Sequence, residues 1–376
     1  MATKVNEFLT KAHRLVIKVG TSTLTHTTGK LNLFQLEQLV QEIAELKKRN
    51  LEVILVSSGA IGAGMGRMGL TERPKTMPEK QALAAIGQGI LMHTYETIFG
   101  EQGELVAQVL LTKDDIAHRE RYLNARNTLL SLLRMGAIPI INENDTVVVE
   151  EIKFGENDTL SALVAGLIDA DLLIILSDID GLYTADPRKD SSACLIPVVE
   201  EITEEIERLA GEAGTKMASG GMATKIKAAR IATNCGIPMI VANGSSNRAL
   251  QEIVEGKNPG TLFLPRDHKI NTRKGWIAYA SRVQGSIWLD AGAIIAIVEK
   301  GKSLLPSGIT RIEGEFQRGD VVCVMRDCGV IARGIVNYSS DELRRIKGLQ
   351  CKEISNVLGY KEEDEVIHRD NLSLIV

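Results

Sequence analysis

The sequence predicts an α/β fold, in which a three-layer αβα sandwich surrounds a mainly parallel sheet and a small β-rich domain follows. Three observations predict it. Apolar runs of strand length alternate with helical stripes up to residue 264, and polar residues follow several of these strands directly. After a polar stretch at 265–275, the pattern changes to short apolar runs separated by glycine. With 376 residues and 44% hydrophobic content, the chain can bury one large core and a second, smaller one.

The first two strands end in small polar residues. Arg14–Val19 is an apolar strand followed by Gly20–Ser22, and Glu52–Val56 is the next strand, followed by Ser57–Ala60. The helical stripe Leu33–Leu46 lies between them. Because the carboxyl ends of parallel strands meet at one edge of a sheet, both polar loops are expected at the edge where open α/β sheets bind ligands.

Lys18 stands near the end of the first predicted strand. A lysine in that position either extends into solvent or points into a crevice. The adjacent Gly20, Thr21 and Ser22 favour the crevice, because glycine lets backbone N–H groups approach an anion and hydroxyls add donors.

The glycines of Gly62–Gly69 contain a formal G-x-G-x-x-G pattern. A dinucleotide fingerprint also needs an acidic residue ending a strand about 20 residues later, and no such strand follows, so we interpret these glycines as a loop or as close packing. Helices at Glu79–Phe99 and Arg121–Met135 are predicted on either side of a strand at Leu105–Leu111.

The stretch Ile140–Arg188 holds two Asn/Asp clusters. Asn142–Asp145 follows the apolar run Ala137–Ile141, while Asn157 and Asp158 precede the helical pattern of residues 159–168. Both clusters can be read as structural, the first as a turn and the second as a helix cap. We favour their convergence on one crevice, beside the strand at 172–176.

Residues 211–225 interrupt all periodicity before a helical pattern resumes at Met222. A Ser-Gly-Gly turn entering a helix offers free N–H groups and the positive end of the helix dipole, with Lys225 one turn in. These features predict a phosphate site, and a flexible linker is the alternative. Helices at 202–209 and 250–254 and strands at 237–242 and 261–264 complete the first domain.

Beyond the polar linker at 265–275, four apolar runs at 286–290, 293–299, 321–325 and 330–338 are predicted to be strands. A near match to a phosphate-binding loop at 296–303 lacks the first glycine, and Pro306 prevents the helix that must follow. We therefore reject a nucleotide site in this region.

Composition narrows the class of protein. The formal net charge is −4, with 44 Lys+Arg and 48 Asp+Glu, which gives no global basic field for nucleic acid or an anionic membrane. Five widely spaced cysteines favour neither a disulfide framework nor a zinc site. The first residues lack an apolar signal region and no run reaches the roughly 20 residues that a bilayer needs, so we expect a cytoplasmic protein.

Six motifs occur in order: KVGTS (18–22), VSSGAI (56–61), INENDTV (141–147), FGENDTLSALVA (154–165), SDIDGLYTADPR (177–188) and SGGMATKIKAA (219–229). Together they resemble the amino-acid kinase family, in particular its members that phosphorylate the side-chain carboxylate of L-glutamate with ATP on the way to proline. LDAGAIIAIVEKGKSLLPSGI, GEFQRGDVVCV and GIVNYSSDEL resemble the PUA domain. The resemblance implies a catalytic domain of residues 1–264, a linker of 265–275 and a PUA domain of 276–376.

The resemblance also implies residue roles. Lys18 and Lys225 would be catalytic, and Lys18 would also contact ATP. Ser58, Asp145 and Asn157 would hold L-glutamate. The residues implied to bind the nucleotide are Lys18, Ser177, Asp178, Ser219, Gly220, Gly221, Met222, Ala223, Thr224 and Lys225. Mg²⁺ would accompany ATP as a cofactor, and no ligand of the metal is assigned.

The chemistry agrees with these residue types. A glutamate carboxylate, with a pKa of about 4.3, is ionised at pH 7 and needs no general base. Its obstacle is repulsion from the triphosphate, which two lysines and Mg²⁺ can offset. Other acceptors within the same fold are N-acetylglutamate, aspartate, carbamate and nucleoside monophosphates. An unblocked ammonium needs a carboxylate such as Asp145, which an N-acetylated substrate would leave unpaired.

The remaining expectations concern partners. Residues 276–376 carry 13 Lys+Arg and 14 Asp+Glu, a net charge of 13 − 14 = −1, so RNA binding is possible but not favoured. A local basic patch at Arg344, Arg345 and Lys347 would be the exception. Family membership would imply a homo-oligomer, either a dimer or a tetramer, with proline as a feedback inhibitor.

Overall fold

The computed structural model describes residues 2–26, 28–147, 156–212, 221–265, 272–327, 329–361 and 363–375. The chain divides into two compact units. Met1–Asp115 and Tyr122–Lys269 form the first, and Ile116–Arg121 and Ile270–Val376 form the second. Each unit has a sheet and a hydrophobic core of its own.

The first unit is built on an eight-stranded sheet with the strand order β3-β4-β2-β1-β5-β7-β8-β6. Its strands are β1 (Arg14–Val19), β2 (Glu52–Ser57), β3 (Val106–Leu111), β4 (Ile138–Glu143), β5 (Leu172–Ser177), β6 (Val198–Val199), β7 (Met239–Asn243) and β8 (Thr261–Phe263). All neighbours pair in parallel except β7 and β8. The predicted α/β fold with a mainly parallel sheet is confirmed.

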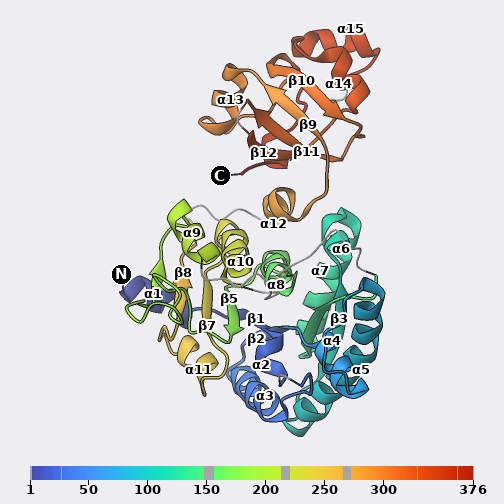
Figure 1. The fold of residues 1–376 in the computed structure, drawn as a ribbon. Helices are drawn as coiled ribbons and strands as arrows, with labels where there is room; N and C mark the ends of the chain where they lie inside the picture. Colours follow the sequence, from blue (N-terminus) through green and yellow to red (C-terminus); the bar gives the residue numbers. More distant parts are fainter. Residues whose placement is uncertain are drawn as a thin grey trace. The chain divides into compact units, whose positions relative to one another are not determined.

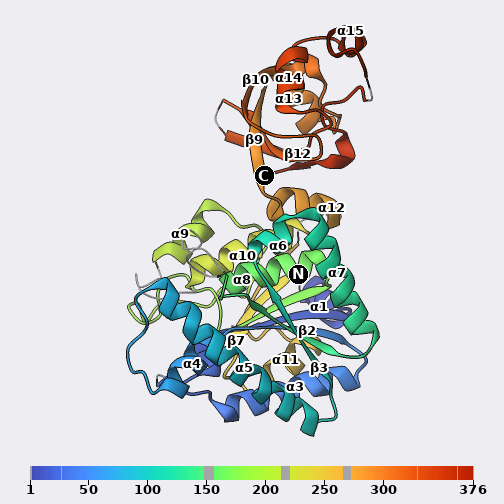
Figure 2. The same cartoon turned by 90° about the vertical axis from the view of Figure 1, so that its right-hand side faces the viewer.

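Helices cover both faces of this sheet. They are α1 (Ala2–Thr10), α2 (Thr21–Leu24), α3 (Leu33–Lys48), α4 (Ala60–Met68), α5 (Met77–Glu101), α6 (Lys113–Ala117), α7 (Arg119–Arg134), α8 (Glu156–Leu167), α9 (Glu204–Glu212), α10 (Met222–Asn234) and α11 (Ala249–Val254). Figures 1 and 2 show α8 and α10 on one side of the sheet and α3 and α11 on the other. The result is the three-layer αβα sandwich that the sequence predicts.

Strand β1 shows how the sheet directs its side chains. Leu15, Ile17 and Val19 belong to the hydrophobic core that includes residues of α3, α5 and α11. Because successive side chains of a strand point to opposite faces, Lys18 lies on the other face, under α8 and α10. The period of the strand therefore decides which helices Lys18 meets.

Helices α4 and α5 pack backbone against backbone. A Cβ atom added at Gly64 would lie 2.1 Å from the Leu83 carbonyl oxygen, and one at Gly87 would lie 1.8 Å from the Ala60 carbonyl oxygen. Of the two interpretations of Gly62–Gly69, close packing is therefore the one that the structure shows. Helix α4 is not predicted from the sequence, because glycine is a poor helix former in isolation.

The second unit contains a five-stranded sheet with the order β10-β9-β11-β12-β13. Its strands are β9 (Val283–Leu289), β10 (Ile309–Gly314), β11 (Val321–Arg326), β12 (Gly329–Ile335) and β13 (Leu372–Leu374). The predicted β-rich character is confirmed. The strand predicted at 293–299 is wrong, because these residues belong to helix α13 (Ala291–Val298), which Asp290 begins by accepting a hydrogen bond from the Ala293 N–H.

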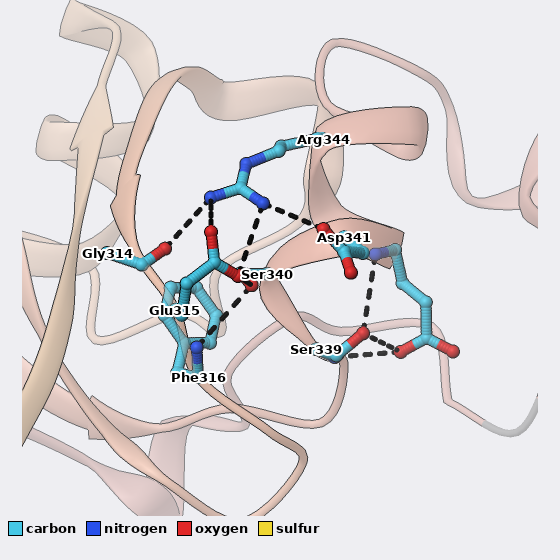
Figure 3. A network of polar contacts seen from close by, with 8 residues as sticks. Gly314, Glu315, Phe316, Ser339, Ser340, Asp341 and Arg344 are labelled. Atoms are coloured by element: carbon cyan, nitrogen blue, oxygen red, sulfur yellow. Dashed lines mark hydrogen bonds and ion pairs between the residues drawn. The ribbon is translucent and has the colours of Figure 1, made fainter.

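Helix α14 (Ser340–Ile346) carries the arginines considered as a basic patch. Its N-terminus is closed by a capping box in which Ser339 and Glu342 each bind the other's backbone N–H. The Arg344 guanidinium contacts Glu315 at 2.7 Å and Asp341 at 2.7 Å, and it also donates to the Gly314 carbonyl oxygen (Figure 3). Two carboxylates thus balance the charge of Arg344.

Four cysteines within the described ranges, Cys194, Cys235, Cys323 and Cys351, are free thiols. Two of them, Cys235 and Cys323, are buried, one in each unit. No helix among the residues described is long and apolar enough to cross a membrane.

Candidate active site

The carboxyl edge of the first sheet gathers the ends of its central strands. β1 leads into Gly20, β2 ends at Ser57, β4 at Glu143 and β5 at Ser177. Helix α8 begins near the same edge, and residues Asn157 and Asp158 occupy its first turn. The two Asn/Asp clusters of the sequence therefore meet at one edge of the sheet, where α/β proteins place their ligands.

Two lysines share one carboxylate at this edge. The Lys18 Nζ lies 2.5 Å from Oδ1 of Asp158, and the Lys225 Nζ lies 3.4 Å from Oδ2 of the same side chain. All three are buried, with exposed fractions of 6% for Lys18, 4% for Lys225 and 1% for Asp158. The ammonium groups come from β1 and α10, so the fold brings together two lysines that are distant in sequence.

Helix α10 supplies more than Lys225. The hydroxyl of Thr224 lies 2.7 Å from Oδ2 of Asp158 and 2.8 Å from the Gly221 carbonyl oxygen. Gly221 precedes the helix in an extended conformation, and Met222 and Ala223 begin it. The first N–H groups of a helix lack intrahelical partners, so this end of α10 presents donors and a positive dipole.

A second hydrogen-bonded set lies beside Asp158. The Asn157 Nδ2 donates to the Ser58 hydroxyl at 2.9 Å and to Oδ1 of Asn142 at 2.9 Å. Because Asn157 and Asp158 are adjacent in α8, this set and the lysine pair are held by the same helical turn. Two residues assigned to the acceptor substrate, Ser58 and Asn157, are thus in direct contact.

The other assigned residues are Ser177, Asp178, Asp145, Ser219 and Gly220. Ser177 is buried at the end of β5 and donates to Asp178 at 3.1 Å, and Asp178 itself is exposed. Asp145 is half-buried in the turn after β4. Ser219 and Gly220 lie outside the described residues.

Comparison with known proteins identifies the family. A family model described as "Amino acid kinase family" matches residues 13–243, and one described as "PUA domain" matches residues 285–358. The chain belongs to the amino acid kinase family. This assignment and the PUA match confirm the resemblance drawn from the six motifs and from the C-terminal segments.

Two curated relatives of this amino acid kinase share a name. This chain is 56% identical to "Glutamate 5-kinase" of Moorella thermoacetica, over 98% of this chain and 97% of that protein. It is 55% identical to "Glutamate 5-kinase" of Carboxydothermus hydrogenoformans, over 99% of this chain and 100% of that protein. Among solved structures, a UMP kinase from Bacillus anthracis covers 68% of this chain and 97% of its own, with 18% identity and a TM-score of 0.47.

Electrostatics in this amino acid kinase depend on Asp158. Burial alone would raise the pKa of its carboxyl, but the charges of Lys18 and Lys225 and the hydrogen bonds from Lys18 and Thr224 outweigh burial, so the pKa is lowered. Burial lowers the pKa of Lys225, Asp158 raises it, and the charge of Lys18 lowers it further, leaving it below the ordinary lysine value. Two ammonium groups and one carboxylate leave the cluster with one excess positive charge.

Asp158 is the residue of this cluster that sequence reasoning left unassigned, because a helix cap explained it equally well. The charges of the two lysines could have indicated a role for Asp158. Two lysines predicted to converge in a buried crevice repel one another, so they require a carboxylate between them. Gln88 of α5, which hydrogen-bonds Asn142 at 2.8 Å, carried no signal, since nothing local distinguishes it from other polar residues of a long helix.

Proposed function

We propose that this amino acid kinase transfers the γ-phosphoryl group of ATP to the side-chain carboxylate of L-glutamate. The products are L-glutamyl 5-phosphate and ADP, and the reaction is the first step of proline biosynthesis. The observation that carries the proposal is the pair of buried lysines on Asp158, beside the N-terminus of α10. The name shared by relatives at 55–56% identity supports glutamate as the acceptor.

The reaction needs charge and alignment, and it moves no proton. An oxygen of the glutamate carboxylate bonds to the γ-phosphorus, while the bond from that phosphorus to the β–γ bridging oxygen breaks and ADP leaves. The attacking carboxylate is already ionised at pH 7, so the protein supplies no base. It supplies the ammonium groups of Lys18 and Lys225, which stabilise negative charge on the transferring group.

Asp158 orients both lysines without contacting the reactants. A carboxylate held by two ammonium groups and the Thr224 hydroxyl keeps each Nζ in one place, so no reorganisation is needed during transfer. We assign Asp158 as a positioning residue. Lys18 and Lys225 are the catalytic residues of the proposal.

Each reactant is assigned its own set of residues beside this cluster. Ser58, Asn157 and Asp145 bind glutamate, with Asp145 opposite its α-ammonium. The nucleotide is bound by Lys18, Ser177, Asp178 and the segment Ser219–Lys225. Support for these roles comes from the contact of Asn157 with Ser58 and from the donors at the start of α10.

Mg²⁺ is proposed to enter with ATP. In the described part of the chain, no group of three His, Cys, Asp or Glu side chains could hold a metal ion. Mg²⁺ bound to ATP takes most of its ligands from phosphate oxygens and water. The proposal therefore needs no cluster of metal-binding side chains. The ion would supply further positive charge at the β- and γ-phosphates.

Further parts of the proposal concern the whole protein. The kinase domain comprises residues 1–264, the linker 265–275 and the PUA domain 276–376. We expect a cytoplasmic homo-oligomer, because the reaction consumes ATP and family members assemble. Proline is the proposed inhibitor, since it shares an α-carboxylate and a charged α-nitrogen with glutamate. RNA is not proposed as a partner, because residues 276–376 carry a net charge of −1.

The deciding experiment is ATP-dependent formation of γ-glutamyl hydroxamate from L-glutamate and hydroxylamine, with and without proline. A parallel screen of ADP release compares glutamate with N-acetylglutamate, aspartate, carbamate and UMP. We expect hydroxamate to form from glutamate, and we expect none of the other acceptors to cause ADP release. If another acceptor is phosphorylated and glutamate is not, the proposed function is wrong and the protein is a kinase for that acceptor.

A further inference from the structure

Three amide side chains are joined in a chain behind the proposed glutamate site. Oδ1 of Asn142 accepts from the backbone N–H of Glu143 at 2.8 Å and from Nδ2 of Asn157 at 2.9 Å. Nδ2 of Asn142 donates to Oε1 of Gln88 at 2.8 Å. A backbone N–H can only donate, so it fixes the oxygen of Asn142 on its own side and the nitrogen toward Gln88.

This anchoring sets the direction of the next amide. Because Asn142 offers an oxygen, Asn157 must offer its nitrogen, which also donates to the Ser58 hydroxyl. The Asn157 Oδ1 is therefore the atom left for a ligand. It is buried and has no hydrogen-bond partner among the described residues. A buried acceptor without a donor is unfavourable, so this oxygen selects a ligand that brings one, such as an ammonium group.

Gln88 holds this chain of amides from α5, and α5 has little freedom to move. Gly87, the preceding residue, packs against the backbone of α4, where even a Cβ would clash. Two turns further along the same helix, the fully buried Tyr95 hydroxyl lies 2.9 Å from the Ser57 hydroxyl at the end of β2. Helix α5 thus reaches the ends of both β2 and β4 from a rigid position.

We propose that Gln88 is a positioning residue that orients the acceptor substrate through Asn142 and Asn157. The inference rests on the proposed function, because it specifies how the glutamate side of that site is held. Gln88 acts through Asn142 and touches no reactant. Its loss leaves Nδ2 of Asn142 without its acceptor, which loosens the amide that directs Asn157. Binding of the acceptor weakens, while the lysine pair on Asp158 is untouched.

The test uses the full-length protein and three variants. Gln88→Met has nearly the same shape but lacks the carbonyl acceptor, whereas Gln88→Glu retains an oxygen that accepts from Asn142. Thr94→Val removes a half-buried hydrogen bond of the same helix, from the Thr94 hydroxyl to the Ile90 carbonyl oxygen, without contact to the amide chain. Thermal unfolding of each variant verifies that it is folded.

We expect Gln88→Met to raise the KM for L-glutamate about tenfold, with the KM for ATP and kcat changed less than about twofold. Gln88→Glu should restore the KM to within about threefold of wild type, and Thr94→Val should leave it unchanged. In an Asn157→Ala background, Gln88→Met should have no further effect on glutamate binding measured by calorimetry, because the two residues act in one chain.

Each part can fail separately. If the wild-type protein does not phosphorylate glutamate, the proposed function is overturned. If wild type is active and Gln88→Met keeps the wild-type KM for glutamate, the role of Gln88 is overturned. It is also overturned if Gln88→Met loses kcat and ATP affinity to the same extent as glutamate affinity. Equal losses in Gln88→Glu and Gln88→Met would likewise exclude an acceptor role for this side chain.

Discussion

At the scale of single residues, Asp158 decides the character of the site. With 1% of its surface exposed, its carboxylate has little water to stabilise it, and the two ammonium groups and the Thr224 hydroxyl take that role. The relation is mutual, since two buried lysines without a carboxylate would repel each other. Removing one member of such a group leaves uncompensated charge inside the protein.

Replacing Asp158 by Asn should therefore lower both stability and activity. We expect the free energy of unfolding to fall by about 3 kcal/mol and kcat by about a hundredfold, since breaking a buried ion pair leaves its partners unpaired. Urea unfolding and steady-state kinetics measure the two effects. Asp169→Asn is the matched control, because Asp169 forms a partly exposed pair with Arg126 at 3.1 Å that should contribute below about 1 kcal/mol. Equal losses in both variants would contradict the special role of Asp158.

The pH dependence of kcat/KM for ATP should report Lys225 of the free protein. Its pKa lies below the ordinary lysine value, and the protonated form is the one that stabilises the phosphoryl group, so kcat/KM should fall as pH rises through this lowered pKa. Asp158→Asn removes the charge that raises the Lys225 pKa, so the alkaline decline should move to lower pH. A pH profile of kcat/KM for both proteins measures the shift. An unchanged decline would show that another group controls it.

Asp158 should also govern stability in acid. Its pKa is lowered in the folded state, so the stability it contributes is present above the unfolded value near 3.8 and is lost as pH falls through the lower folded pKa. Urea unfolding of wild type and Asp158→Asn across acid pH measures this contribution. The two free-energy curves should converge as the pH falls below the folded pKa. Curves that stay parallel would place the acid sensitivity in other groups.

Two alanine variants separate binding from chemistry. Asp145→Ala should mainly raise the KM for glutamate, because Asp145 is assigned to the α-ammonium, which is present equally before and during transfer. Lys225→Ala should mainly lower kcat, because its charge is most needed as negative charge shifts during transfer. Steady-state kinetics in both substrates distinguishes the two effects. Unchanged constants in both variants would refute the site.

At the scale of elements, the packing of α4 against α5 supports the acceptor side of the site. Gly87 lies one residue before Gln88, and a Cβ there would lie 1.8 Å from the Ala60 carbonyl oxygen and 2.4 Å from the Gly64 nitrogen. The helices can approach this closely only because neither carries a side chain at the contact. The glycines of this region therefore serve packing, and their flexibility in isolation is suppressed.

Gly87→Ala should consequently destabilise the first unit by about 3 kcal/mol, because the backbone of α4 must move away. Gly89→Ala is the control on the same helix, since an added Cβ there meets no atom within 4 Å beyond the adjacent residues and backbone of α5 itself. It should stabilise the protein by about 0.5 to 1 kcal/mol through helix propensity. Urea unfolding measures both free energies. Similar effects of the two substitutions would contradict the close packing.

At the scale of the whole molecule, two hydrophobic cores belong to two units. The first unit contains the lysine cluster, and the second unit contains residues 285–358, which match the PUA model. Separate cores permit separate unfolding transitions. Ligands that bind one unit stabilise that unit.

Scanning calorimetry of the full chain should therefore show two transitions. Adding ATP with Mg²⁺ should raise the midpoint of the transition that belongs to the first unit and leave the other within about 1 °C. Tryptophan fluorescence assigns the second transition, because Trp276 and Trp288 both lie in the second unit. One cooperative transition that shifts as a whole would show that the units unfold together.

Local sequence patterns predicted most of the fold. Seven of the eight strands in the first unit follow from apolar runs bounded by polar turns, whereas the two-residue strand β6 (Val198–Val199) is not predicted. The start of α10 follows from the glycines before it. Failures occurred where a local pattern supports two structures. The apolar run of α13 suits a strand as well as a helix, and the glycines of α4 become helical only because α5 packs on them.

The sequence by itself predicted that the polar residues after the strands would lie at one edge of a parallel sheet, because strand period and turn chemistry depend on near neighbours. The resemblance to the kinase family, and no local pattern, implied that Lys18 and Lys225 meet there. Only the tertiary structure decided that β1 lies between β2 and β5, that Asp158 contacts both Lys18 and Lys225, and that Gln88 faces Asn142. These contacts join residues of different elements. Their geometry depends on strand order and helix packing, which no local pattern contains.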